Sequence, residues 1–191
     1  MSLTTDNELA RLGALLTHDD EALNAQGEEL LAALAEGDGL RRARLCVRAG
    51  ALIDGVRAIR ALEITLEAGP LRRLACDLAA EAVDIFEADF KPEPGQPRRD
   101  PRCDAVIAGA RAVAAGTQPL SHLDALLPLA LAADEHGWWE TEAVYAVLHK
   151  DALAAFDDAA RSLWLLVRHS RRGWAAAAPP AVREGLLRLL G

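Results

Sequence analysis

Apolar side chains recur every three or four residues over most of this 191-residue chain, with polar side chains between them. That spacing places one apolar stripe on an α-helix, whereas a half-buried strand alternates with a period of two. The clearest stripe lies in residues 71–90 and consists of Leu71, Leu74, Ala75, Leu78, Ala82, Ile85 and Phe86. The pattern predicts a helix that buries this stripe, with Leu78, Ile85 and Phe86 in the core.

A proline-rich connection follows this helix. Three prolines between residues 92 and 97 exclude a helix there, because proline lacks a backbone N–H and clashes with the preceding turn. Asp100 and Pro101 then form a typical helix start, an aspartate N-cap followed by proline at the first helical position. Residues 71–113 are therefore expected to form a central helix–loop–helix.

The same spacing predicts several other helices. They are expected at residues 5–16, 20–35, 40–67, 121–135, 138–150 and 152–170, with a short final helix after Pro179-Pro180. The last two long segments are read either as two helices or as one bent helix. Helix 121–135 contains Pro128, which we expect to kink or restart it.

Capping residues and glycines set the expected ends of the N-terminal helices. Thr5 and Glu8 have the spacing of a capping box, and Asp19 or Asp20 precedes the second helix as its N-cap. Gly37 and Gly39 are expected to end that second helix. The segment 40–67 is expected to be one helix, in which Gly50 and Gly55 either weaken the helix or mark close packing.

The sequence shows no strand-like alternation and no hairpin signal. We therefore predict an all-α fold, a single domain over residues 1–191 that forms a bundle of about nine helices. A content of 51% hydrophobic and 26% charged residues is typical of a globular chain. The absence of a signal-peptide pattern and of a long uncharged stretch favours a soluble cytoplasmic protein without a membrane span.

Candidate catalytic and metal-binding residues are few. No Glu-x-x-His occurs and no two histidines are three or four residues apart. The clusters 18–21 and 134–136 contain histidine and carboxylates, but consecutive residues point around a helix in different directions, so surface charge or capping is expected. We expect the three cysteines, Cys46, Cys76 and Cys103, to be buried reduced thiols. These observations predict no enzyme activity, no cofactor and no metal.

Charge is unevenly distributed along the chain. The net charge is −8, residues 1–36 carry eight acidic and one basic side chain, and residues 159–191 carry one acidic and six basic. An acidic protein without aromatic residues among its arginines is not expected to bind nucleic acid. Acidic and basic stretches thus alternate along the chain. Two explanations are open: neighbouring helices carry complementary charges, or an acidic face binds a basic partner.

Two groups of residues are candidates for binding a partner. Asp77, Glu81, Asp84 and Glu87 share the outer face of helix 71–90, where they form either a solvated surface or a site for a basic protein. The adjacent pair Trp138-Trp139 cannot bury both side chains in one core, so we interpret it as a lid over the core or as a contact anchor.

One stretch resembles a known family. The family has a Cys/Ala-rich helix ending in a "pIFE" segment, a loop with Arg-Pro-Arg and a helix of "aIeAaRaw" type. Here the corresponding residues are Cys76-Asp77-Leu78-Ala79-Ala80, Asp84-Ile85-Phe86-Glu87, Arg99-Asp100-Pro101-Arg102 and 105–113 (AVIAGARAV). Residues 76–163 thereby resemble the Imm-5-like immunity proteins of bacterial polymorphic-toxin systems. The chain differs in having Arg-Asp-Pro-Arg in the loop and Val113 in place of the aromatic.

The resemblance implies a small helical protein that binds and neutralises a cognate bacterial toxin without catalysis of its own. The alternative from the residues alone is a helical scaffold or a regulatory protein that binds a small ligand, and an unrecognised enzyme ranks third. The sequence predicts no particular oligomeric state.

Overall fold

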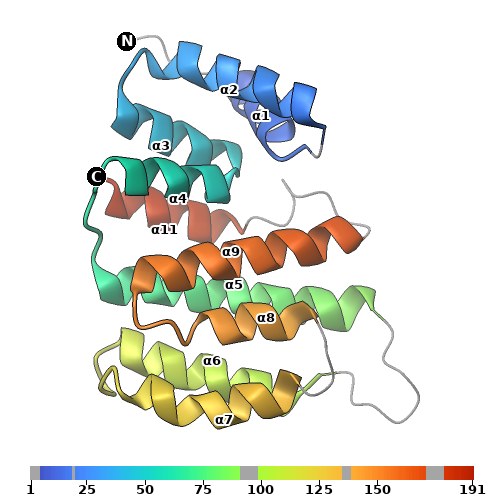
Figure 1. Cartoon of the computed structure of the whole chain (residues 1–191), viewed down its shortest axis with the longest axis vertical. Coiled ribbons are helices and arrows are strands. Elements are labelled where there is room, and N and C mark those ends of the chain that lie inside the picture. The colour runs from blue at the N-terminus through green and yellow to red at the C-terminus, as the bar shows by residue number, and fades with distance from the viewer. Residues whose placement is uncertain (1–4, 19, 91–98, 135–138, 171–178) are drawn as a thin grey trace. The chain divides into compact units, whose positions relative to one another are not determined.

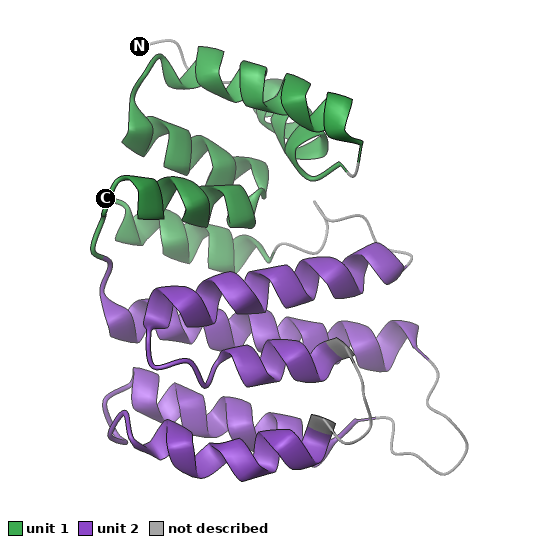
Figure 2. Cartoon of the chain, in the orientation of Figure 1, with its two compact units in different colours: residues 1–65, 174–191 green, residues 66–173 purple. Residues whose placement is uncertain are grey.

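The computed structural model describes residues 5–18, 20–90, 99–134, 139–170 and 179–191. In these residues it contains ten α-helices and no β-strand, so the all-α prediction is confirmed, with one helix more than the approximate number expected. The chain divides into two compact units (Figure 2), residues 1–65 with 174–191 (unit 1) and residues 66–173 (unit 2). The interpretation as a single domain over 1–191 stays a prediction.

Unit 1 contains five of the described helices (Figure 1). They are α1 (Asp6–Leu16), α2 (Glu21–Ala35), α3 (Gly39–Ala49), α4 (Leu52–Ala61) and α11 (Pro180–Leu189). The predicted capping box is present at α1, where the backbone N–H of Thr5 donates to the carboxylate of Glu8 at 2.8 Å. Asp20 is the N-cap of α2 and accepts hydrogen bonds from two backbone N–H groups, so of the two predicted caps, Asp19 and Asp20, the structure has Asp20.

The single helix expected at residues 40–67 is wrong. Gly50 adopts φ +85° and ends α3 in the left-handed conformation, which glycine reaches without a Cβ penalty. The chain then starts α4 at Leu52, and Gly55 packs against Val47 of α3. The second helix ends at Ala35 as predicted, but Gly39 has another role than expected, because it is the first residue of α3, capped by Asp38.

The core of unit 1 forms where α1, α2 and α3 meet. It contains Leu12, Leu16, Leu31, Ala35, Leu45, Cys46, Ala49 and Ala51. α1 approaches α3 so closely that a Cβ on Gly13 would overlap the carbonyl oxygen of Ala49. At the other side of α3, the guanidinium of Arg44 donates to the Leu190 carbonyl oxygen at 2.8 Å and thereby joins α3 to the end of α11.

Unit 2 contains the other five described helices. They are α5 (Ala68–Asp89), α6 (Pro101–Ala114), α7 (His122–Asp134), α8 (Trp139–Ala146) and α9 (Ala152–His169). Asp100 caps α6 and Pro101 is its first residue, as predicted. Pro128 lies inside α7 without ending it. The C-terminal stripe forms two helices rather than one bent helix, because Asp151 caps a new start at α9.

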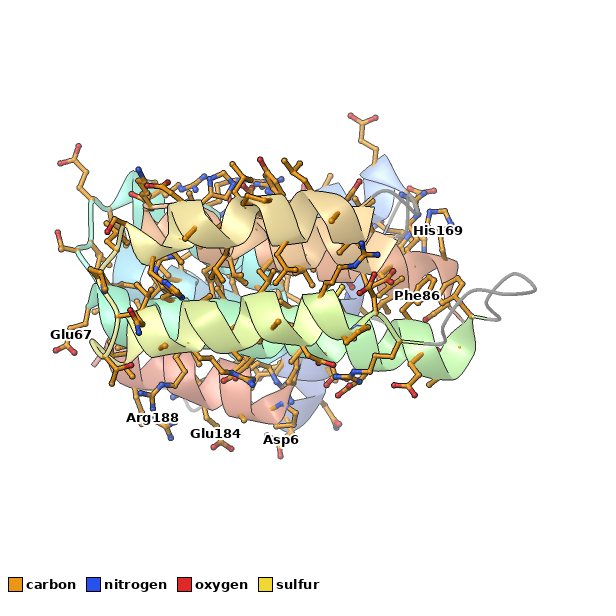
Figure 3. All side chains as sticks on the ribbon, turned by 90° about the horizontal axis from the view of Figure 1, so that it is seen from below. Asp6, Glu67, Phe86, His169, Glu184 and Arg188 are labelled. Carbon is orange, nitrogen blue, oxygen red and sulfur yellow. The ribbon has the colours of Figure 1, made fainter. Side chains whose placement is uncertain are left out.

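α5 is the central helix of unit 2 and packs against α6, α8 and α9. Leu78 and Ile85 are fully buried, which confirms two of the three core predictions. Phe86 is only half-buried and stacks on Phe90 with 5.1 Å between ring centroids, so its assignment to the core is wrong. Phe86 follows Ile85 by about 100° around the helix and therefore falls at the edge of the buried stripe, near the C-terminal end of α5 (Figure 3).

The three cysteines are free and buried, as predicted. Burial raises the pKa of each thiol to about 12, so the thiolate is not populated at neutral pH. Within the described residues, every helix is too short or too polar to cross a lipid bilayer.

Candidate functional site

Three large apolar side chains on α7 and α8 are exposed to solvent. Leu127 and Leu131 on α7 are 36% and 51% exposed, and Tyr145 on α8 is 42% exposed. The two helices run in opposite directions (Figure 1). Side chains three or four residues apart share a helix face, so Leu127 and Leu131 form one row and Glu142 and Tyr145 form another. We call the surface formed by Leu127, Leu131, Glu142, Tyr145 and His149 the α7–α8 surface.

This surface is hollowed in two places. Six residues from α7, α8, α9 and the α8–α9 turn line a hollow of about 320 Å³: Leu131, Glu142, Tyr145, Ala146, His149 and Asp158. A second hollow of about 170 Å³ is lined by six residues, two of which also line the first: Leu123, Asp124, Leu127, Tyr145, Leu148 and His149. Because Tyr145 and His149 border both hollows, the hollows adjoin, and we call the two together the depression.

Charged side chains line the rim of the depression. The Nε2 atom of His149 lies 2.8 Å from a carboxylate oxygen of Asp158, and the Nζ atom of Lys150 lies 3.1 Å from a carboxylate oxygen of Asp124. Glu142 is exposed and makes no ion pair with any described residue. The edge therefore carries three carboxylates against one lysine and one histidine.

A buried arginine holds the turn below this surface. Arg72 of α5 is 3% exposed, and its guanidinium donates to the backbone carbonyl oxygens of Val147, His149 and Lys150 at 3.0, 2.7 and 2.7 Å. These carbonyls follow the end of α8, where the helix has no partners for them. Burial lowers the pKa of Arg72, although a guanidinium stays charged at any physiological pH. Arg72 thus fixes the backbone from which His149 and Lys150 project.

Most of the predicted acidic face is already engaged by arginines. Arg111 of α6 lies 2.8 Å from Asp77, and Arg99 lies 2.6 Å from Asp84 and 3.1 Å from Glu87. These three acids therefore face α6 and the segment before it. Their ion pairs agree with the explanation that neighbouring helices of this chain carry complementary charges. Glu81, the fourth member, is half-buried between them.

Arg99 is the centre of this network. It also binds Asp104 through two of its nitrogens, at 2.8 and 2.7 Å. The hydrogen bonds that Arg99 donates to Asp104, Asp84 and Glu87 raise the pKa of Arg99, and the bonds to Asp104 lower the pKa of Asp104. The network ties the start of α6 to the last turns of α5.

The other sequence candidates contribute less. Trp138 lies outside the described residues, and Trp139 is the first residue of α8, with its side chain also outside them. In the cluster 18–21, Nδ1 of His18 accepts a hydrogen bond from the backbone N–H of Asp20 at 3.0 Å. The cluster 134–136 lies outside the side chains that are described. In the described part of the chain, no three His, Cys, Asp or Glu side chains gather as metal ligands would.

Sequence reasoning missed Glu140, which is 2% exposed near the start of α8. Its Oε2 atom has no hydrogen-bond partner among the described residues, and burial, with a smaller contribution from the charge of Asp100, raises the pKa of Glu140 to about 7. The signal was present, because Glu140 shares a helix face with the buried residues Ala143, Val144 and Val147. A carboxylate in an apolar stripe is the pattern that identifies such a residue.

Comparison with known proteins adds no identification: no family model matches the chain, and no curated protein or solved structure is significantly similar to it.

Proposed function

We propose that this is a non-enzymatic binding protein that neutralises a bacterial toxin by direct contact. The toxin is suggested by the resemblance of residues 76–163 to Imm-5-like immunity proteins. That range falls entirely within unit 2, residues 66–173, so the segment with the resemblance corresponds to part of one compact body.

The exposed apolar side chains of the α7–α8 surface carry the proposal. Leu131 and Tyr145 expose about half of their surface beside a depression instead of packing into the core. Clusters of exposed apolar groups with a polar edge are typical of protein-binding surfaces, and tyrosine is one of the residues that contribute most to such interfaces. We therefore propose that the toxin contacts this part of unit 2.

The acidic face on α5 remains a second candidate surface for the same function. A basic toxin that binds Asp77, Asp84 and Glu87 must replace the ion pairs that these acids make with Arg99 and Arg111. That exchange reduces the net gain, because one set of charge pairs is lost as another forms. Glu142, in contrast, has no ion pair to lose among the residues that the structure describes, which favours the α7–α8 surface.

The test uses a toxin domain encoded beside the gene for this protein. The proposal predicts that co-expression restores growth of cells producing the toxin and that the two purified proteins form a stable complex. Absence of both protection and complex formation would contradict it. Leu131→Glu, on the α7–α8 surface, should lose protection, whereas Leu62→Glu, at an exposed leucine of unit 1, is the control and should protect fully.

A small-ligand regulator is the alternative. The larger hollow, of about 320 Å³, lies at the lower end of the size range of ligand sites, roughly 300–1,000 Å³. A compound that raises the melting temperature of the protein and shifts the Tyr145 resonances, in a protein that gives no toxin protection, would favour this alternative.

A further inference from the structure

We propose that the α7–α8 surface binds a basic amphipathic helix of the partner protein, with apolar side chains in the depression and a lysine or arginine paired to Glu142. This inference rests on the proposed function in one respect, that the partner is a protein. It adds the chemistry of the segment that the partner inserts.

The shape of the surface suits a helix. Asp124, Leu127 and Leu131 follow each other at intervals of three and four residues on α7, and so lie along one line. The line spans seven residues, which is about 10 Å or two helical turns. A row with the same spacing runs beside it in the opposite direction, from Glu142 to Tyr145 and on to His149 after the end of α8. Two parallel ridges with a depression between them accept the side chains of a third helix.

Three side chains supply the apolar part of the contact. Leu127, Leu131 and Tyr145 border the depression, while the charged groups lie around it. An arrangement of central apolar contacts and a polar edge excludes water from the centre of an interface. A partner helix with leucine-like side chains at positions i, i+4 and i+7 places them along this line.

The charges at the edge select a basic partner. Glu142 is exposed without an ion pair among the described residues, and Asp158 has only His149 as its counterpart. The one lysine at the edge, Lys150, is already paired with Asp124. An incoming cation therefore gains an interaction at Glu142 without displacing another cation, whereas an incoming acid meets an excess of negative charge.

The same charges disfavour a second copy of this chain as the occupant. Two copies joined through this surface would place six carboxylates at the interface against two lysines and two histidines. The chain as a whole also carries a net charge of −8, so the copies repel each other at low ionic strength.

The experiment uses two synthetic helical peptides of about twelve residues on the full chain. Both carry leucine at positions i, i+4 and i+7; the first carries lysine and arginine at its polar positions, and the second carries glutamate there. Binding is followed by backbone amide chemical shifts in NMR titrations. We expect the basic peptide to shift the resonances of residues 124–131 and 142–149, and the acidic peptide to leave them unchanged.

Two variants and their controls locate the contact. Tyr145→Ala removes the central aromatic side chain and Glu142→Lys reverses the unpaired charge; each is expected to weaken binding of the basic peptide about tenfold or more. Leu62→Ala and Glu184→Lys make the corresponding changes, truncation and charge reversal, at exposed positions in unit 1 and should leave the affinity unchanged. Circular dichroism of each variant confirms that the fold is retained.

The inference is overturned if both peptides shift the same resonances equally, if neither shifts the α7–α8 surface, or if Glu142→Lys binds as the wild type does. A concentration-dependent dimer that shows the shifts without peptide would assign the surface to a second copy instead. These outcomes are separate from the toxin test: a toxin that binds while Tyr145→Ala and Glu142→Lys have no effect contradicts only this inference, and a basic peptide that binds while the toxin does not contradicts only the proposed function.

Discussion

The guanidinium of Arg72 donates to the backbone carbonyl oxygen of His149 at 2.7 Å, and the imidazole of the same His149 lies 2.8 Å from Asp158. A buried arginine of the central helix α5 thus fixes one residue at the edge of the α7–α8 surface. Since Arg72 also donates to the carbonyls of Val147 and Lys150, one side chain contacts three of the four residues between α8 and Asp151.

Replacement of Arg72 by methionine is therefore expected to destabilise unit 2. Three buried or half-buried carbonyl groups lose a charged donor, and the expected loss in the free energy of unfolding is about 2–4 kcal/mol. Urea denaturation measures it. Arg73→Met is the matched control, because the neighbouring Arg73 is exposed, and it should change stability by less than about 0.5 kcal/mol. Equal effects of the two substitutions would show that the hydrogen bonds of Arg72 contribute nothing specific.

Glu140 predicts a dependence of stability on pH. Burial raises its pKa in the folded protein to about 7 from the usual 4.5, so the folded state holds a proton that the unfolded state has released between these values. The resulting stabilisation is fully present below about pH 4.5 and is lost as the pH rises through about 7, by on the order of 3 kcal/mol.

Glu140→Gln tests this dependence, because a neutral amide cannot ionise. Its stability should be nearly constant between about pH 5 and 8, where that of the wild type falls, and Glu142→Gln at an exposed position should behave as the wild type. Thermal unfolding across this pH range is the measurement. Parallel pH profiles for Glu140→Gln and the wild type would contradict the assignment.

The four acids Asp77, Glu81, Asp84 and Glu87 allow the two explanations of their role to be separated. Reversal of all four to lysine leaves Arg99 and Arg111 facing like charges, so we expect a lower melting temperature. The melting temperature and the toxin affinity are measured on this quadruple variant. A lower melting temperature shows that the four acids pair with arginines of the same chain. An unchanged melting temperature together with lost toxin binding would place the interface on α5 and contradict the α7–α8 assignment.

The correction at Phe86 has its own test. Ile85 is fully buried, and Ile85→Ala should cost about 2–5 kcal/mol of unfolding free energy. Phe86 is half-buried, so Phe86→Ala should cost less than the 3–5 kcal/mol typical of a buried aromatic, about 1–2 kcal/mol. Chemical denaturation of both variants decides it, and a larger loss for Phe86→Ala than for Ile85→Ala would restore Phe86 to the core.

Helix starts were predictable because they depend on local chemistry. The Thr5–Glu8 capping box and the Asp100-Pro101 start involve residues close in sequence, and the structure forms both. The break at Gly50 was not predicted, because a glycine in an apolar stripe fits both a continuous helix and a left-handed helix end. Packing between α3 and α4 decides between the two.

The candidate site was less predictable than the helices. In the sequence, nothing distinguishes the buried Arg72 from its exposed neighbour Arg73. The three acceptors of Arg72 are backbone carbonyls about 75 residues away, which no sequence pattern indicates. The exposure of Leu131 and Tyr145 is equally hidden, because their spacing matches a buried stripe. Glu140 is different: a carboxylate within a buried stripe could have been recognised from the sequence.

Calorimetric titration of the toxin domain into three forms of the protein tests the central claim most directly. Leu131→Glu places a charge at the most exposed apolar position of the α7–α8 surface, while Leu62→Glu makes the same change on unit 1. The account predicts that the wild type and Leu62→Glu bind the toxin with equal affinity and that Leu131→Glu binds about a hundredfold more weakly. Equal affinity for all three forms would contradict the account.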